Sequence, residues 1–159
     1  MNLNKYIKRK LISHINEEEI NRYSSFFSNS FKENLAHSKA NISNFPRWSI
    51  ISGYYAMHDI TKLFLVKKLN IKIDFNVHKT TIEILKEIKT DKELLKLLKT
   101  GYSEFILLLN DLTKAKKERT KMQYYTGSDF MRNKYKEKSP QFLEKIVIPY
   151  LNKINSLLK

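Results

Sequence analysis

Cysteine is absent from this 159-residue chain, and glycine and proline occur only three times each. Without cysteine the protein has no disulfide, no thiolate nucleophile and no cysteine-bound metal. So few glycines and prolines are unusual for a β-sandwich and natural for a helical protein. The sequence also lacks any apolar run of the ~20 residues that cross a bilayer, so we expect no membrane association.

The N-terminal sequence MNLNKYIKRKL is basic but is followed by no apolar core and no small-residue cleavage site. It is therefore not a secretory signal, and we expect the protein in the cytoplasm. Hydrophobic residues make up 42% of the chain and aromatic residues 12%, which is enough for a folded core. The length predicts one domain over residues 1–159.

Acidic residues are scarce relative to basic ones. Thirty Lys and Arg residues against sixteen Asp and Glu residues give a net charge of +14. A field of this size favours polyanions, so RNA, DNA, nucleotides or an acidic partner are the expected ligands. The alternative is lysine enrichment from a biased genome or a hot habitat, and we favour the polyanion interpretation.

The segment Arg47–Leu69 predicts a helix that is apolar on most of its sides in its first half. Such a helix belongs in the middle of a bundle. Gly53 costs about 1 kcal/mol relative to alanine inside a helix, so we expect close packing against it. Asn70 is a typical helix end.

Apolar periodicity predicts the remaining helices. Asn16, followed by three glutamates, is a good helix start, and Gly101 and Pro149 are expected to end and to kink helices. The expected elements are a short accessory helix within residues 1–15, helices over 17–43, 77–88, 91–100, 104–125 and 139–158, an extended connection at 71–76 and a basic loop at 126–138. The sequence thus predicts an all-α, up-and-down bundle of five or six helices.

Few residues carry recognisable chemistry. The four histidines are His14, His37, His58 and His78, and no two have the i, i+3 or i, i+4 spacing of metal ligands on a helix. With no known motif for a metal or a cofactor, we expect neither. His58 adjoins Asp59 and Lys62, which we interpret as a partly exposed polar patch. Arg119 lies on the apolar stripe of its helix, where we expect it to be paired, to be functional, or to reach past the helix end to water.

Two stretches resemble the HEPN family of small all-α domains. SGYYAMHDITKLFL is similar to the family's tyrosine-rich second helix, and ERTKMQYY, residues 118–125, is similar to its last long helix. That helix carries R-x4–6-H in members that cleave RNA without metal, and R-x-x-A-D-Y in a related branch. Here Arg119 matches the arginine, and Tyr124 stands where the first motif has histidine and the second has tyrosine. The resemblance covers roughly residues 23–159.

The resemblance implies a symmetric homodimer with Arg119 near its two-fold axis. Arginine holds a phosphate but does not deprotonate a ribose hydroxyl near neutral pH, and tyrosine, with a pKa near 10, is a poor base there. We therefore expect an RNA- or nucleotide-binding dimer that does not cleave. The residues expected to bind are Arg119, Lys114, Lys116, Lys117, Lys121 and Tyr125.

Two alternatives remain open. One is an atypical metal-independent ribonuclease that uses Arg119 and Tyr124, with His58 as the first candidate for the missing base. The other is a partner module for a nucleotidyltransferase, as in toxin–antitoxin pairs, where Tyr124 or Tyr125 would receive a nucleotide.

Overall fold

The chain folds almost entirely into helices. The computed structural model describes residues 3–88, 91–121 and 127–159, and between residues 112 and 132 it describes the helical backbone only. The elements are α1 (Asn4–Lys8), β1 (Ile12–His14), α2 (Glu17–Ala40), α3 (Pro46–Leu69), β2 (Ile71–Ile73), α4 (Val77–Glu87), α5 (Lys92–Lys121), α6 (Gly127–Phe142), the π-helical turn η1 (Leu143–Val147) and α7 (Ile148–Leu158). The predicted all-α bundle is confirmed.

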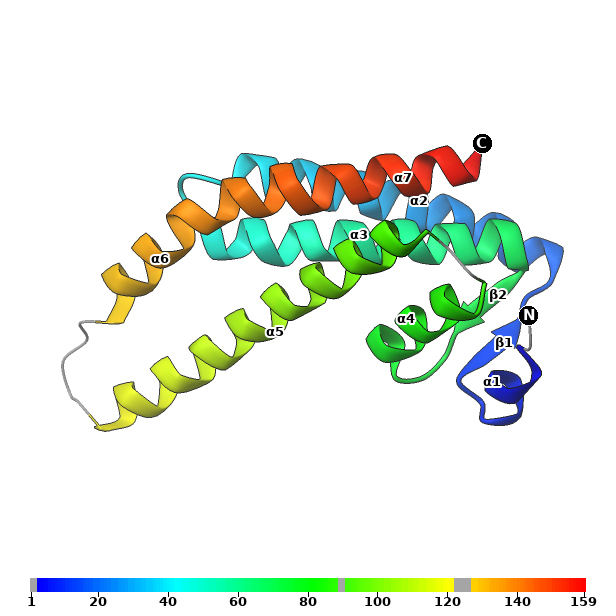
Figure 1. Cartoon of the computed structure of the whole chain (residues 1–159), viewed down its shortest axis with the longest axis horizontal. Coiled ribbons are helices and arrows are strands. Elements are labelled where there is room, and N and C mark those ends of the chain that lie inside the picture. The colour runs from blue at the N-terminus through cyan, green and yellow to red at the C-terminus, as the bar shows by residue number, and fades with distance from the viewer. Residues whose placement is uncertain (1–2, 89–90, 122–126) are drawn as a thin grey trace.

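Helix α3 lies at the centre of the bundle. It packs against α2, α5, α6 and α7, and Figure 1 shows it between α7 and α5. Sixteen of its 24 residues are buried, so this helix hides nearly all of its sides from water. The predicted place of this segment in the middle of a bundle is therefore confirmed, although Trp48 and Tyr55 on one of its faces remain exposed.

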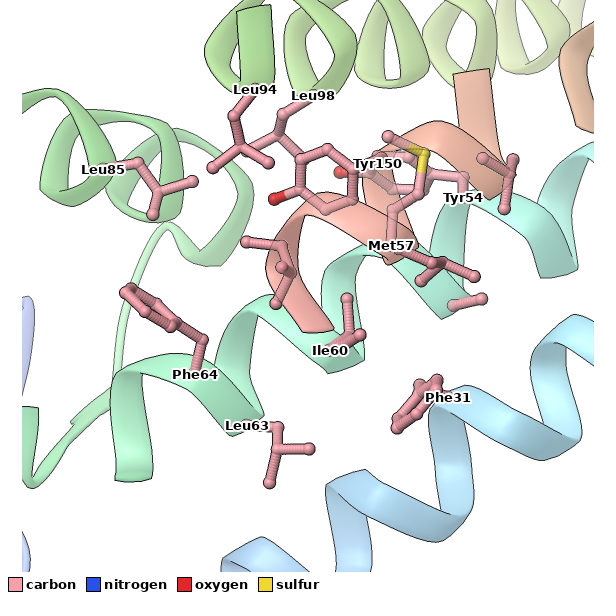
Figure 2. Packing of buried hydrophobic residues seen from close by; sticks show 14 of the residues in the cluster. Phe31, Tyr54, Met57, Ile60, Leu63, Phe64, Leu85, Leu94, Leu98 and Tyr150 are labelled. Carbon is pink, nitrogen blue, oxygen red and sulfur yellow. The ribbon is translucent and has the colours of Figure 1, made fainter. Parts of the chain in front are cut away.

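The core forms where α3 meets its neighbours. Figure 2 shows side chains of α3 meeting those of α5 and α7 on one side and Phe31 of α2 on the other. Met57 and Ile60 of α3 are fully buried, as is Leu94 of α5. Burial of one such side chain stabilises the fold by about 1.5–3 kcal/mol, so this contact region holds α5 and α7 against α3.

Helices α2 and α3 begin and end as their sequences predict. The Asn16 side chain accepts a hydrogen bond from the Glu19 N–H at 2.8 Å, and the Glu19 carboxylate accepts one from the Asn16 N–H at 3.2 Å. This reciprocal capping box satisfies two backbone donors at the start of α2. Pro46 opens α3, and Asn70 ends it in the left-handed conformation with φ 53°.

The N-terminal segment differs from the expected accessory helix. Helix α1 ends at Lys8, and the chain then forms strand β1, which pairs antiparallel with β2 so that Ile12 faces Ile73. Ile12 is buried, and burial with this strand pairing outweighs the helical periodicity of residues 1–15. Asn70 and the strand residues after it thus return the chain toward its own N-terminus.

Two predicted interruptions are helical in the structure. Gly101 does not end a helix but lies inside α5, where a Cβ built at this glycine would be 3.0 Å from Met57 Sδ. The predicted loop at 126–138 is wrong from Gly127 onward, because α6 begins there. The Tyr135 hydroxyl donates to Asp111 Oδ2 at 2.7 Å, and Lys138 Nζ lies 2.7 Å from Glu104 Oε2. These contacts fasten the polar helix α6 to α5.

The last helix widens into a π-helical turn just before Pro149. In η1 the Ile148 N–H donates to the Leu143 carbonyl, five residues back. Because proline has no N–H and its ring crowds the preceding turn, a wider turn there relieves the strain. Ser139 and Pro140, the expected cap of this helix, lie within α6, which runs on into η1. No helix in the described ranges is long and apolar enough to span a membrane.

The close packing expected at Gly53 is present. A Cβ built on this glycine would lie 3.0 Å from Val147 Cγ2, 3.1 Å from Ser38 Oγ and 3.2 Å from Phe142 Cε1. Helix α2, the end of α6 and η1 therefore approach α3 at one point, where a side chain would fit only if its neighbours shifted. This contact explains why the helix accepts the conformational cost of glycine.

Candidate functional site

The basic residues expected to bind RNA lie in the last turns of α5. Lys114, Lys117 and Lys121 share one face of this helix at 3.6 residues per turn, and Lys116 and Arg119 share another. Tyr124 and Tyr125 lie outside the described residues. The structure thus places the five basic positions on one helix.

Positive charge is concentrated around this part of the chain. Residues 114–138, which we call the basic arm, contain nine Lys and Arg residues and three Asp and Glu residues. The arm therefore carries +6 of the net charge of +14 in less than a sixth of the chain. Figure 1 shows the C-terminal end of α5 and the N-terminal end of α6 lying away from α2, α3 and α7. Part of this highly charged segment thus lies outside the main bundle, whereas its end is packed against the bundle through the buried Tyr135.

A second group of polar residues is buried between α3, α4 and α5. His58 of α3 and His78 of α4 have ring centroids 4.8 Å apart, and the Tyr54 hydroxyl is hydrogen-bonded to His78 Nδ1 at 2.5 Å. The Tyr102 ring stacks on His78 at 5.5 Å, and Phe105 stacks on Tyr54 at 4.7 Å. These five rings form a continuous aromatic cluster that joins three helices.

The interpretation of His58 and Asp59 as a partly exposed patch is wrong. His58 is 2% exposed and Asp59 6% exposed. One turn before His58, Tyr54 is buried on the same side of α3, and α4 covers both. The spacing rule missed the His58–His78 pair because the two histidines lie on different helices, and only the tertiary fold brings them together.

Burial controls the protonation of this cluster. Burial lowers the pKa of His58 well below its usual value, and the charges of Lys62 and His78 lower it further. Burial and the Lys62 charge also lower the pKa of His78, whereas burial raises that of Tyr54. Both imidazoles are therefore neutral near pH 7. Neither His58 ring nitrogen has a hydrogen-bond partner within the described structure.

A hydrogen-bonded network lies on the adjoining side of α3. Asp59 Oδ2 accepts hydrogen bonds from Ser30 at 2.6 Å and from Asn34 at 3.0 Å, both on α2. Its other oxygen lies 3.6 Å from Lys62 Nζ. Burial lowers the pKa of Lys62, and the charge of Asp59 partly offsets that effect. A half-buried cation thus lies beside a buried carboxylate, and its charge acts on the buried His58 and the half-buried His78.

The chemical capacities of the two regions differ. The basic arm can hold phosphates, whereas His58 is too deeply buried to touch an RNA strand in this structure. Among the residues that the structure describes, no three His, Asp or Glu side chains gather around a position for one metal ion. The sequence contained one signal for this region, which is the group His58, Asp59 and Lys62 within the largely apolar stretch 48–66.

Comparison with models of known protein families finds no match for this chain. Comparisons with curated proteins and with solved structures find none either. The likeness to HEPN domains therefore depends on the sequence pattern around residues 52–65 and 118–125 alone.

Proposed function

We propose that this protein binds RNA or nucleotides through the basic arm and does not cleave them. The observation that carries this proposal is the charge of +6 concentrated in residues 114–138. Phosphate groups bound by such a segment release condensed counterions, which gives sequence-independent affinity. Arg119 is the residue best suited to hold a phosphate with two parallel hydrogen bonds, and the lysines of α5 add point charges around it.

The absence of cleavage follows from the residue types in the arm. Arg119 can stabilise the charge of a transition state, but Tyr124 stands where the ribonuclease motif has its histidine. A positioned acid or base is worth about 10²–10⁴-fold in rate, so its loss leaves only traces of activity. The burial of His58, the first candidate for a substitute base, supports the same conclusion.

A homodimer belongs to this proposal. Trp48 is 56% exposed and Tyr55 is 39% exposed, and the two lie seven residues apart on one face of α3. Two large aromatic side chains on one face are typical of a protein-binding surface. We expect sedimentation of the protein at tens of micromolar, a concentration above the usual range of Kd for a stable dimer, to show a dimer. Only monomer at that concentration would contradict this part of the proposal.

The binding experiment compares two triple variants with the same loss of charge. Fluorescence anisotropy with a single-stranded RNA of 20 nucleotides is measured from low to high salt. In Lys114→Gln, Lys117→Gln, Lys121→Gln we expect the slope of log K against log salt to fall by about 2, because each lost phosphate contact is worth about 0.7. The control is Lys8→Gln, Lys39→Gln, Lys67→Gln, three exposed lysines outside the arm. Equal losses in both variants, or no RNA binding at all, would overturn the proposal.

The cleavage experiment uses the same RNA with chelator near pH 7. We expect no more than trace hydrolysis by the wild type. Tyr124→His recreates the R-x4-H spacing and is the variant in which activity should rise. Robust wild-type cleavage that Arg119→Ala abolishes would contradict the proposal and favour the ribonuclease alternative.

A further inference from the structure

A cavity of about 270 Å³ lies between α2, α3, β2 and the start of α4. Its walls include the aromatic rings of Tyr23 and Phe27, the charged groups of Lys62, Lys72 and Asp74, and aliphatic residues such as Val66. Strand β2 contributes to its wall, and in Figure 1 this strand lies at the opposite end of the molecule from the C-terminal end of α5 and the N-terminal end of α6. The cavity is therefore separate from the surface to which we assign RNA binding.

The two lysines of the cavity are only loosely paired with protein carboxylates. Lys62 Nζ lies 3.6 Å from Asp59 Oδ1, and Lys72 Nζ lies 3.5 Å from Glu19 Oε1. Charge-assisted hydrogen bonds between such groups are normally about 2.7–2.9 Å long. Asp59 also accepts hydrogen bonds from Ser30 and Asn34 through its other oxygen, so its charge is shared among three partners. Both ammonium groups thus retain donors for a further anion.

Each of these cations also lies over an aromatic ring. Lys62 Nζ is 5.2 Å from the centre of the Phe27 ring, and Lys72 Nζ is 5.7 Å from that of Tyr23. Both cation–ring pairs therefore line the same cavity. A ligand with a planar ring can stack on these aromatic side chains while its charged group reaches the ammonium groups.

We propose that this cavity binds a small molecule that has one aromatic ring and one anionic group, either a phosphate monoester or a carboxylate. The volume lies just below the 300–1,000 Å³ typical of small-molecule sites, which suits a single ring. The aliphatic walls would shield the aromatic ring of the ligand from water. The anionic group of the ligand would pair with the half-buried ammonium of Lys62, which Asp59 neutralises only in part. This site does not depend on the RNA-binding proposal.

Calorimetric titration with four probes tests the site. Phenyl phosphate and benzoate carry both features, inorganic phosphate carries only the charge, and phenol carries only the ring. We expect at least one of the first two to bind about tenfold or more tightly than either single-feature probe, which is about 1.4 kcal/mol. The one that binds better identifies the anionic group. Equal affinity for phenyl phosphate, benzoate and inorganic phosphate, or no saturable binding by any probe, would overturn the proposal.

Variants locate the binding. Lys62→Met and Lys72→Met should each weaken the better probe about tenfold or more, whereas Lys68→Met, at an exposed position of α3, should not. The charge of Lys62 is one cause of the lowered pKa of His78, so an anion bound to Lys62 should raise the pKa of His78. An NMR titration of the histidines measures this change. The triple variant of the arm should bind the probe as the wild type does. Equal weakening by Lys68→Met, or loss in the arm variant, would place the probe elsewhere and contradict the proposal.

Discussion

Helix α3 and the basic arm use their side chains in opposite ways, since α3 buries most of its residues and the arm carries a high density of charge. In α3, sixteen of 24 residues are buried, and its neighbours cover most of its sides. The arm has nine basic residues among residues 114–138, and its helix ends lie away from the main bundle. Substitutions in α3 should therefore change stability, whereas substitutions in the arm should change binding. The following experiments test that separation, from the largest expected effect to the smallest.

The largest effect is expected at Gly53. Gly53→Leu places a side chain against Val147 and Phe142, whose nearest atoms already lie 3.0 and 3.2 Å from a built Cβ. We expect the free energy of unfolding to fall by about 3 kcal/mol, the upper end of the usual cost of overpacking. Chemical denaturation followed by circular dichroism measures it.

The matched control is a pair of alanine substitutions. At Gly101 the close neighbours of the built Cβ are atoms at the flexible end of Met57, and Ile146 lies at an ordinary 3.8 Å, so Gly101→Ala should be neutral or stabilising by up to about 1 kcal/mol. At Gly53 the same change meets a branched side chain and a ring, and it should destabilise. If both alanine substitutions changed the free energy of unfolding in the same direction, the packing around Gly53 would not differ from that around Gly101 in the way proposed.

The second effect is a pH dependence from the buried histidine. The folded protein holds His58 neutral at pH values where the unfolded chain, with a pKa near 6.5, takes up a proton. The stability from this group is thus complete above pH 6.5 and falls by about 1.4 kcal/mol for each pH unit below it. His58→Leu should reduce the slope of stability between pH 6.5 and 5.5 and leave only the contribution of His78, whose pKa is also lowered, and the exposed His14→Gln serves as the control. An unchanged slope in His58→Leu would contradict the burial of His58.

The third effect concerns a hydrogen bond between α3 and α7. Thr61 Oγ1 donates to the Met57 carbonyl at 2.7 Å, so the Tyr150 hydroxyl is the donor in its 2.6 Å bond with Thr61. Tyr150→Phe should lower the free energy of unfolding by about 1 kcal/mol, because Thr61 keeps its other bond. The Thr61→Val, Tyr150→Phe double variant measures the coupling, and a coupling of zero would show that the bond adds nothing.

The smallest effect is expected in the arm. Lys114→Gln, Lys117→Gln, Lys121→Gln should change the free energy of unfolding by no more than about 0.5 kcal/mol while RNA affinity falls. Thermal unfolding without RNA measures the first quantity. A loss above 2 kcal/mol would mean that the arm helps to hold the bundle together, and the separation between the two regions would fail.

Local signals predicted the parts of the fold whose causes are local. The capping box at Asn16 and Glu19, the proline at the start of α3 and the apolar sides of Arg47–Leu69 each act within a few residues. The errors occur where distant contacts decide. Ile12 forms a strand because Ile73 pairs with it, and α5 runs through Gly101 because Met57 packs there. Helix α6 has a polar sequence, and its contacts with Asp111 and Glu104 were not readable from spacing.

The candidate sites were predicted to different extents. The basic residues of the arm were visible in the sequence, which predicted the lysines around Arg119 as binding residues and a basic stretch at 126–138. The aromatic cluster around His58 was missed because His78 lies twenty residues further along the chain, on another helix. The cavity beside Lys62 was missed for the same reason, since Lys72 reaches it from strand β2. Sites built from several elements depend on the fold, which no single stretch contains.

The wide turn η1 makes the number of residues in the C-terminal helix more important than the identity of its exposed side chains. Phe142 and Val147 both contact the position of Gly53, yet residues five apart face different directions in an ordinary α-helix. The five-residue hydrogen bond of η1 brings both over the same point. Deletion of one residue here would turn Tyr150 and Ile154 by about 100° relative to α6. An exposed residue such as Lys145 is therefore free to change its side chain but not to be lost.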